Sequence, residues 1–245
     1  MNDFGLQVYT IRNYLTDASQ CEKAYLAVKN AGYLFVQLAG SKEMLTLSAD
    51  ACKKLGIKVY GILTDINFCY ENSQFLFDLA KDVGATDLGI SGGISDMENP
   101  LPFVEKVNKF ALLAKENGFT FSYHNHAWEF MKTADGKIAM DVLIENFLPI
   151  VNFMPDTYWL QHGGQNVPDF LLKIRGRVEA VHLKDMKIVG NDHTFAEIGQ
   201  GVLDFNKIIA TAKECGAKHF IVEQDSCDGD SLAAIKTSSD CLKTL

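Results

Sequence analysis

The centre of the chain reads Lys115-Glu116-Asn117-Gly118-Phe119-Thr120-Phe121-Ser122-Tyr123-His124. A lysine in the last turn of a helix complements the negative end of the helix dipole, and a glycine just after the helix tolerates the left-handed conformation that ends many helices. Residues 119–124 then alternate between large aromatic and polar side chains, which is typical of a strand. The segment therefore predicts a helix that ends near residue 118 and a strand that follows it directly.

The same lysine and glycine, three residues apart, recur along the chain at positions 29–32, 53–56, 81–84, 115–118, 173–176 and 213–216. After these signals we expect strands at residues 33–38, 57–63, 86–91, 119–124, 177–183 and 218–223. Two further strands are expected at residues 4–9 and 151–156, the second of them after a helical segment at 141–147. Helix, glycine and strand together form the repeating unit of the chain.

Eight strands that alternate with helical segments predict parallel β-α-β units with right-handed crossovers. Eight such units in 245 residues match a (β/α)8 TIM barrel, and no Pro-rich or Ser-rich linker divides the chain, so we expect an α/β fold with a single domain over residues 1–245. The rival fold, a doubly wound open sheet, usually carries a Gly-x-Gly-x-x-Gly turn after its first strand. Here the first strand runs into Gln7-Val8-Tyr9-Thr10 instead, which favours the barrel.

The composition is that of a globular protein, with 47% hydrophobic and 22% charged residues. The 31 acidic residues outnumber the 23 basic ones to give a net charge of −8, and the basic residues form no cluster, so we expect no nucleic-acid partner. The six cysteines are scattered without a Cys-x-x-Cys pair, which indicates free thiols in a reducing compartment. Because no segment is typical of a signal peptide or a membrane span, we expect a cytoplasmic protein with no membrane partner.

Chemistry in barrels of this kind gathers at the carboxyl ends of the strands. The last four expected strands end in metal-capable side chains: His124, Asp156, His182 and Glu223. Since residues two apart in a strand share a face, His124 shares its face with Ser122 and points into the barrel, away from Tyr123. Two imidazoles and two carboxylates without a cysteine suit one divalent metal ion, with Mn²⁺, Zn²⁺, Co²⁺ and Mg²⁺ as alternatives. The other interpretation is a hydrogen-bonded polar core without an ion.

Eight segments, in order along the chain, carry a family resemblance: residues 5–12, 123–130, 156–159, 163–164, 176–177, 181–186, 195–201 and 221–225. They are similar to the xylose isomerase-like TIM barrels that are often called the sugar phosphate isomerase/epimerase family. The resemblance implies a divalent ion that holds the carbonyl and hydroxyl oxygens of a sugar, beside carboxylates that move a proton between carbons. The implied function is a metal-dependent isomerase or epimerase of a small sugar, keto sugar or sugar phosphate.

Roles for individual residues follow from the resemblance together with their residue types and positions. Glu223 is the first choice for a base that also binds the ion, and Glu129, on the loop after the fifth strand, is the candidate second base. Lys184 is expected to neutralise an oxyanion or phosphate. The residues expected to contact the sugar are Gln7, His126, Trp159 and His193. Solvated positions are the other interpretation for Glu129 and Lys184, and a wedge between barrel and helix is the other interpretation for Trp159.

The chain departs from the family pattern where many relatives end strand five in a glutamate and this chain has His124. This change leaves room for a metal-dependent dehydratase or lyase acting on a keto sugar or keto-inositol, and for a catalytically inactive sugar-binding barrel. The apurinic endonuclease branch of the superfamily is disfavoured by the acidic charge and by the presence of only six histidines. The sequence leaves open which sugar binds, whether it is phosphorylated, which ion is used, and whether the protein forms a homo-oligomer.

Overall fold

A computed structural model describes residues 3–94 and 96–245 and shows a ring of eight parallel strands. The strands are β1 (Phe4–Gln7), β2 (Phe35–Ala39), β3 (Lys58–Thr64), β4 (Asp87–Ser91), β5 (Thr120–His124), β6 (Val151–Met154), β7 (Ala180–Leu183) and β10 (His219–Val222). Their order is β6-β5-β4-β3-β2-β1-β10-β7. Backbone bonds from Phe153 N to Arg177 O (2.7 Å) and from His182 N to Pro155 O (2.9 Å) join the two ends of the sheet. The expected (β/α)8 TIM barrel is therefore confirmed.

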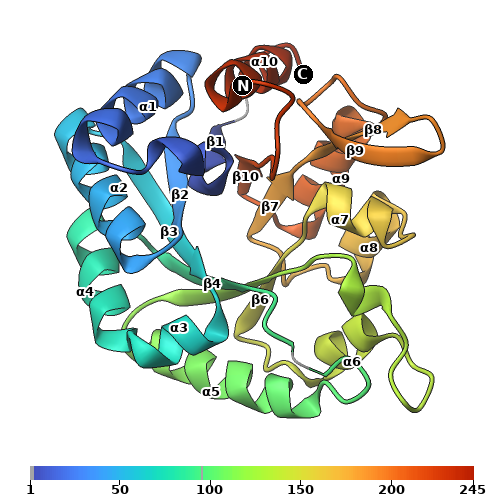
Figure 1. The fold of residues 1–245 in the computed structure, drawn as a ribbon. Helices are drawn as coiled ribbons and strands as arrows, with labels where there is room; N and C mark the ends of the chain where they lie inside the picture. The colour runs from blue at the N-terminus through green and yellow to red at the C-terminus, as the bar shows by residue number, and fades with distance from the viewer. Residues whose placement is uncertain (1–2, 95) are drawn as a thin grey trace.

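The helices surround this ring (Figure 1). They are α1 (Ala18–Ala31), α2 (Lys42–Leu55), α3 (Ile66–Glu71), α4 (Ser73–Val83), α5 (Leu101–Glu116), α6 (Ala139–Asn146), α7 (Thr157–His162), α8 (Val167–Lys173), α9 (Phe205–Cys215) and α10 (Ser231–Leu242), with short 3-10 helices η1 (Val8–Tyr14) and η2 (Trp128–Phe130). All six glycines of the repeated signal have positive φ, and Gly32, for example, ends α1 at φ 99° while its N–H donates to Lys29 O. The repeated signal thus marks helix ends as predicted.

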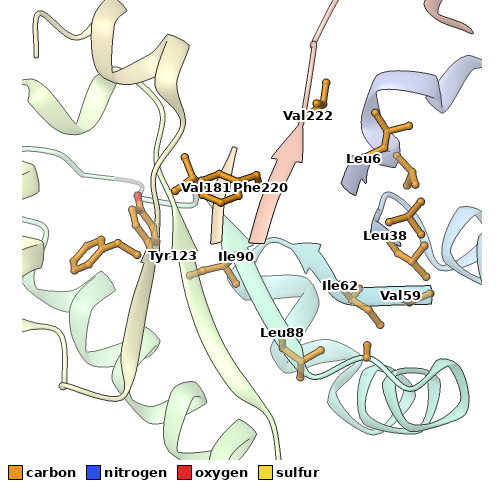
Figure 2. Packing of buried hydrophobic residues seen from close by; sticks show 14 of the residues in the cluster. Leu6, Leu38, Val59, Ile62, Leu88, Ile90, Tyr123, Val181, Phe220 and Val222 are labelled. Atoms are coloured by element: carbon orange, nitrogen blue, oxygen red, sulfur yellow. The ribbon is translucent and has the colours of Figure 1, made fainter. Parts of the chain in front are cut away.

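Alternation along the strands separates an inner face from an outer face. Figure 2 shows outward-facing residues packed in the layer between barrel and helices, among them Leu6, Leu38, Val59, Ile62, Leu88, Ile90, Tyr123, Val181, Phe220 and Val222. A smaller inner cluster is formed by Phe35, Tyr60, Met154, Ala180 and Ile221. The carboxyl ends of the inner faces are polar instead, because β1, β2, β5 and β7 place Gln7, Gln37, His124 and His182 there, all of them buried.

Three features differ from the sequence-based expectation. The strand expected at residues 4–9 ends at Gln7, and η1 begins at Val8. Strand β6 ends at Met154, and Asp156 instead begins α7, where its Oδ1 accepts the N–H of Trp159 at 2.9 Å. An antiparallel hairpin, β8 (Asp185–Val189) and β9 (Asp192–Ala196), follows β7 and projects from the ring of helices in Figure 1. No helix in residues 3–94 and 96–245 is long and apolar enough to span a membrane.

Candidate functional site

Four buried side chains meet at the carboxyl end of the barrel: His124, Asp156, His182 and Glu223. One potential ligand atom from each lies within 4.8 Å of all the others. Nδ1 of His182 is 2.8 Å from Oε2 of Glu223, and Nε2 of His124 is 4.0 Å from the same oxygen. The structure thus brings together the four residues that strand parity predicted to converge. We call this group the four-residue cluster.

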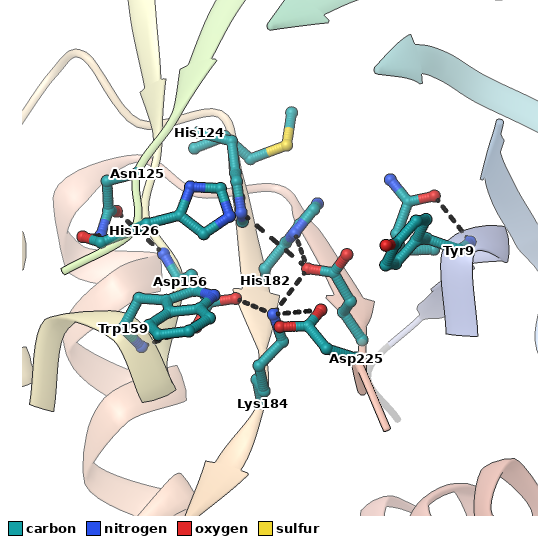
Figure 3. Close-up of polar contacts among 12 residues, drawn as sticks. Tyr9, His124, Asn125, His126, Asp156, Trp159, His182, Lys184 and Asp225 are labelled. Carbon is teal, nitrogen blue, oxygen red and sulfur yellow. Dashed lines mark hydrogen bonds and ion pairs between the residues drawn. The ribbon is translucent and has the colours of Figure 1, made fainter. Parts of the chain in front are cut away.

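A lysine lies beside the cluster with its side chain fully buried. The Nζ atom of Lys184 is 2.9 Å from Asp156 Oδ2, 3.1 Å from Glu223 Oε2 and 3.1 Å from Asp225 Oδ1 (Figure 3). Its backbone is held by the Thr157 hydroxyl, which accepts from Lys184 N and donates to Lys184 O, both at 2.8 Å. The solvated interpretation of Lys184 is therefore wrong. Sequence reasoning assigned no role to Asp225, although its position two residues after Glu223 was the signal that both could face the same side.

The charges in the site follow from burial and from these ion pairs. Burial raises the pKa of Asp156 to about 6, while Lys184 acts in the opposite direction. Burial also acts to raise the pKa of Glu223, but Lys184 and His182 outweigh it and hold that pKa well below its usual range. Burial lowers the pKa of His124 well below its usual value and that of His126 to about 4. These directions favour ionised carboxylates and a neutral imidazole of His124 at neutral pH, which are the forms that bind a metal ion.

The donor set fits a divalent ion. Two imidazole nitrogens and two carboxylate oxygens within one small volume suit Mn²⁺, Zn²⁺ or Co²⁺, and Mg²⁺ with additional oxygen ligands. Among the described residues, Oδ2 of Asp156 and Nδ1 of His124 are buried without a hydrogen-bond partner. The oxygen of Asp156 is nevertheless paired with the ammonium of Lys184 at 2.9 Å, and the nitrogen of His124 nearest Glu223 is Nε2. The fit to an ion therefore rests on the chemistry and closeness of the four donors.

A cavity of about 630 Å³ opens beside the cluster, over the carboxyl ends of the first four strands. Its wall includes His124 and Glu223 from the cluster, as well as Gln7, His126 and Asp225. Cavities of roughly 300–1,000 Å³ are typical of sites for small molecules. A molecule in this cavity would contact the imidazole of His124 and the carboxylate of Glu223 directly. Gln7 and His126, which sequence reasoning assigned to substrate binding, share this wall.

The remaining sequence-assigned residues lie around the cavity rather than in its wall. Trp159 is half-buried, with its ring 5.5 Å from the ammonium of Lys184 and 5.2 Å from the ring of His126. His193 is exposed on β9, where it hydrogen-bonds to His162 at 2.5 Å. The structure does not bring His193 into the cavity wall.

Glu129 is fully buried within η2, so its interpretation as a solvated loop residue is wrong. Its carboxylate accepts the hydroxyl of Tyr123 at 2.6 Å and the backbone N–H of His126 at 3.0 and 3.1 Å. These contacts turn the carboxylate towards the outer layer of the barrel and fix the start of the loop that carries His126. Its assignment as a second base stays a prediction.

Comparison with known proteins finds one family whose sequence pattern covers most of the chain. The sequence pattern of the family described as "xylose isomerase-like TIM barrel" matches residues 26–245. Inosose dehydratase of Clostridium perfringens is 35% identical over 84 residues, a match that spans 34% of this chain and 27% of that protein. The chain therefore aligns with about a quarter of the length of this curated relative.

Solved structures share the fold over the whole chain. A sugar phosphate isomerase/epimerase from Parabacteroides distasonis has a TM-score of 0.76 and 20% identity, covering 100% of this chain and 99% of its own. A xylose isomerase-like TIM barrel protein from Mycobacterium smegmatis, in complex with magnesium, has a TM-score of 0.72 and 15% identity, covering 100% of this chain and 96% of its own. At these identities the likeness concerns the fold alone.

Proposed function

The chain belongs to the xylose isomerase-like TIM barrel family, and from this premise we propose that it is a divalent-metal-dependent enzyme that removes a proton beside the carbonyl of a small keto sugar or sugar derivative. The observation that carries the proposal is the position of Glu223, which belongs to the four-residue cluster and also lines the cavity. An ionised carboxylate at that position is suited to accept a proton from a molecule in the cavity. The family pattern supports an enzyme rather than a barrel that only binds sugar.

The residues that would hold the ion are His124, Asp156, His182 and Glu223. When bound there, a divalent ion supplies Lewis-acid polarisation of the sugar carbonyl, which makes the neighbouring C–H bond more acidic. Glu223 accepts the proton, and the ammonium of Lys184 at 3.1 Å keeps its carboxylate ionised before the transfer. General acid–base catalysis of this kind is worth roughly 10²–10⁴-fold in rate.

Return of the proton gives an isomerase or epimerase, which is the first form of the proposal. In this form Glu223 returns the proton to the neighbouring carbon, or a second group returns it to the opposite face. We assign this return of the proton to His126, in the cavity wall, or to Lys184, beside the cluster. The sugar phosphate isomerase/epimerase of the same fold supports this form.

A dehydratase or lyase is the second form, and the direction of Glu129 favours it. With that carboxylate bonded to Tyr123 and the His126 amide, β5 and the residues just after it present the neutral imidazoles of His124 and His126 to the cavity and no second carboxylate base. One base is enough when the enolate, instead of being reprotonated, expels a hydroxyl group from the adjacent carbon, because the proton that Glu223 took leaves with that hydroxyl as water. The segment similar to inosose dehydratase supports this form, with a keto-inositol as the substrate.

The first experiment measures the metal content of protein purified without chelator, for the wild type and for His182→Ala. We expect about one equivalent of Mn²⁺, Zn²⁺, Co²⁺ or Mg²⁺ in the wild type and a large loss in the variant. Absence of metal from the wild type, even after incubation with these ions, would overturn the proposal and favour a polar core in a sugar-binding barrel.

The second experiment separates the two forms. The metal-loaded protein is incubated in D₂O with ketohexoses, ketopentose phosphates and inososes, and the products are followed by NMR and mass spectrometry. Deuterium beside the carbonyl with no loss of water identifies the isomerase or epimerase. Loss of one water from the substrate identifies the dehydratase.

A further inference from the structure

A row of hydrogen bonds crosses the inside of the barrel from β1 to β7. The backbone N–H of Tyr9 donates to Oε1 of Gln7 at 3.2 Å. Nε2 of Gln7 donates to Oε1 of Gln37 at 2.7 Å, and the same oxygen lies 2.7 Å from Nε2 of His182. Both glutamines and His182 are fully buried, so water does not compete for these bonds.

The chemistry of the groups fixes the direction of this row. A backbone N–H can only donate, so Gln7 must turn its oxygen to Tyr9 and its NH₂ group to Gln37. Gln37 must then turn its oxygen to Gln7, because two NH₂ groups cannot bond to each other. In this orientation the nitrogen of the Gln37 amide lies 3.3 Å from the sulfur of Met154. Sulfur is a weak acceptor, so this contact is consistent with an NH₂ group at that position.

The direction of the row decides which nitrogen of His182 carries a proton. The oxygen of Gln37 only accepts, so Nε2 of His182 must be an N–H donor. A metal ion binds an imidazole through its unprotonated nitrogen, which leaves Nδ1. Nδ1 is the nitrogen that faces the cluster, 2.8 Å from Oε2 of Glu223, an oxygen that also only accepts. Without an ion, Nδ1 therefore donates its proton to Glu223, and an ion at the cluster would take the place of that proton.

The pairing of β1, β2 and β3 places the side chains of this row next to one another. Parallel pairing sets Gln7 directly beside Gln37. The pairing of β2 with β3 shifts register between Val36 and Gln37, and Gly61, which has no side chain, is the partner of Gln37 across the shift. The extra residue at the shift is Tyr60 of β3, whereas β2 keeps its regular alternation, so Gln37 shares the inner face with Phe35. Gln37 therefore points into the barrel, where it meets His182.

We propose that Gln7 and Gln37 are positioning residues, which hold His182 with its proton on Nε2 and thereby present the lone pair of Nδ1 to the ion. This inference rests on the proposed function, because it assumes that the cluster binds a metal. Outer partners of ligating histidines commonly control ring orientation and metal affinity. The amide of Gln37 could otherwise turn its NH₂ group to His182, and the bond from Gln7 opposes that orientation.

The test measures binding of Zn²⁺ and Mn²⁺ by calorimetry without sugar, so that contact of Gln7 with a substrate does not enter. Gln37→Met removes the acceptor at nearly constant volume and should weaken binding by about 10–100-fold. Gln37→Glu supplies an oxygen in either orientation and should bind at least as tightly as the wild type. Thermal unfolding of the metal-free variants checks that each one folds.

Gln7→Met gives the sharper result when it is made in two backgrounds. With Gln37 present, the amide loses the group that orients it, and binding should weaken by about tenfold. In the Gln37→Glu background, both oxygens of the carboxylate accept, so adding Gln7→Met should cause no further loss. A role of Gln7 in packing alone would give the same loss in both backgrounds.

These measurements distinguish a failure of the metal site from a failure of the positioning role. No binding by the wild type would defeat the proposed function itself. Binding by the wild type, with equal losses from Gln7→Met in both backgrounds, would overturn the positioning role while the metal site stands. In the ¹H–¹⁵N spectrum of the zinc-loaded wild type, a proton on Nε2 of His182 is expected, and a proton on Nδ1 would also overturn the inference.

Discussion

The Nζ atom of Lys184 lies 2.9 Å from Oδ2 of Asp156, and neither side chain is exposed to solvent. The same ammonium is 3.1 Å from Glu223 and from Asp225, so one positive charge balances three carboxylates at the end of the barrel. The carboxylates raise the pKa of Lys184 above its usual value although burial alone would lower it. In the metal-free protein this lysine supplies the positive charge beside the candidate ligands.

Lys184→Met should therefore destabilise the metal-free protein by about 3–5 kcal/mol, because breaking a buried ion pair leaves a buried charge without compensation. Urea unfolding of the metal-free variant measures this change. The matched control is Lys187→Met, which breaks an exposed pair with Asp228 and should cost less than about 1 kcal/mol. Similar costs for the two variants would show that Lys184 does not stabilise the cluster.

Glu223→Gln should abolish turnover and weaken metal binding, because it removes both the proposed base and one ligand charge. A loss of at least about 10²–10⁴-fold in kcat/KM is expected from the base alone. Steady-state kinetics on a confirmed substrate and calorimetry with Mn²⁺ provide the two measurements. Cys227→Ser, at a partly exposed thiol outside the cluster, should change neither. Full activity of Glu223→Gln would show that another group takes the proton.

The fold could be predicted because its signals are local. The lysine and glycine at each helix end, and the strand that follows, depend on residues only a few positions apart. The convergence of His124 and His182 was predictable for the same reason, since side-chain alternation needs only the position of each strand. The strand bounds were less certain, and Asp156 proved to begin α7 rather than to end β6.

The interior contacts of the site depend on residues far apart in the sequence and were not predictable. Nothing near Lys184 in the sequence shows that Asp156 and Asp225 surround its ammonium. The row from Gln7 to His182 joins strands separated by more than a hundred residues, and the register shift at Gln37 has no sequence signal that we recognise. The hairpin of β8 and β9 was missed because the expected barrel already accounted for all eight strands.

Glu129→Gln tests whether this residue is a base or a support for its loop. Glutamine keeps the size of the side chain and an oxygen that can accept from Tyr123 or from the His126 amide. We therefore expect kcat/KM to fall by less than about tenfold, whereas loss of a general base would cost about 10²–10⁴-fold. A loss as large as that of Glu223→Gln would establish Glu129 as the second base.

Asp87→Asn should stabilise the protein at alkaline pH. Burial raises the pKa of Asp87 to about 7, against hydrogen bonds from Thr120 and Ser122 that lower it. The folded chain therefore holds a proton that the unfolded chain releases near pH 4, and the free energy of unfolding falls as pH rises from about 4 to about 7. Asparagine has no such proton, so the variant should be more stable by up to about 4 kcal/mol at pH 8 and nearly equal at pH 4 in urea unfolding.

The exposed control Asp82→Asn should differ from the wild type by less than about 1 kcal/mol at both pH values. A gain for Asp87→Asn that did not depend on pH would contradict a buried proton at this position.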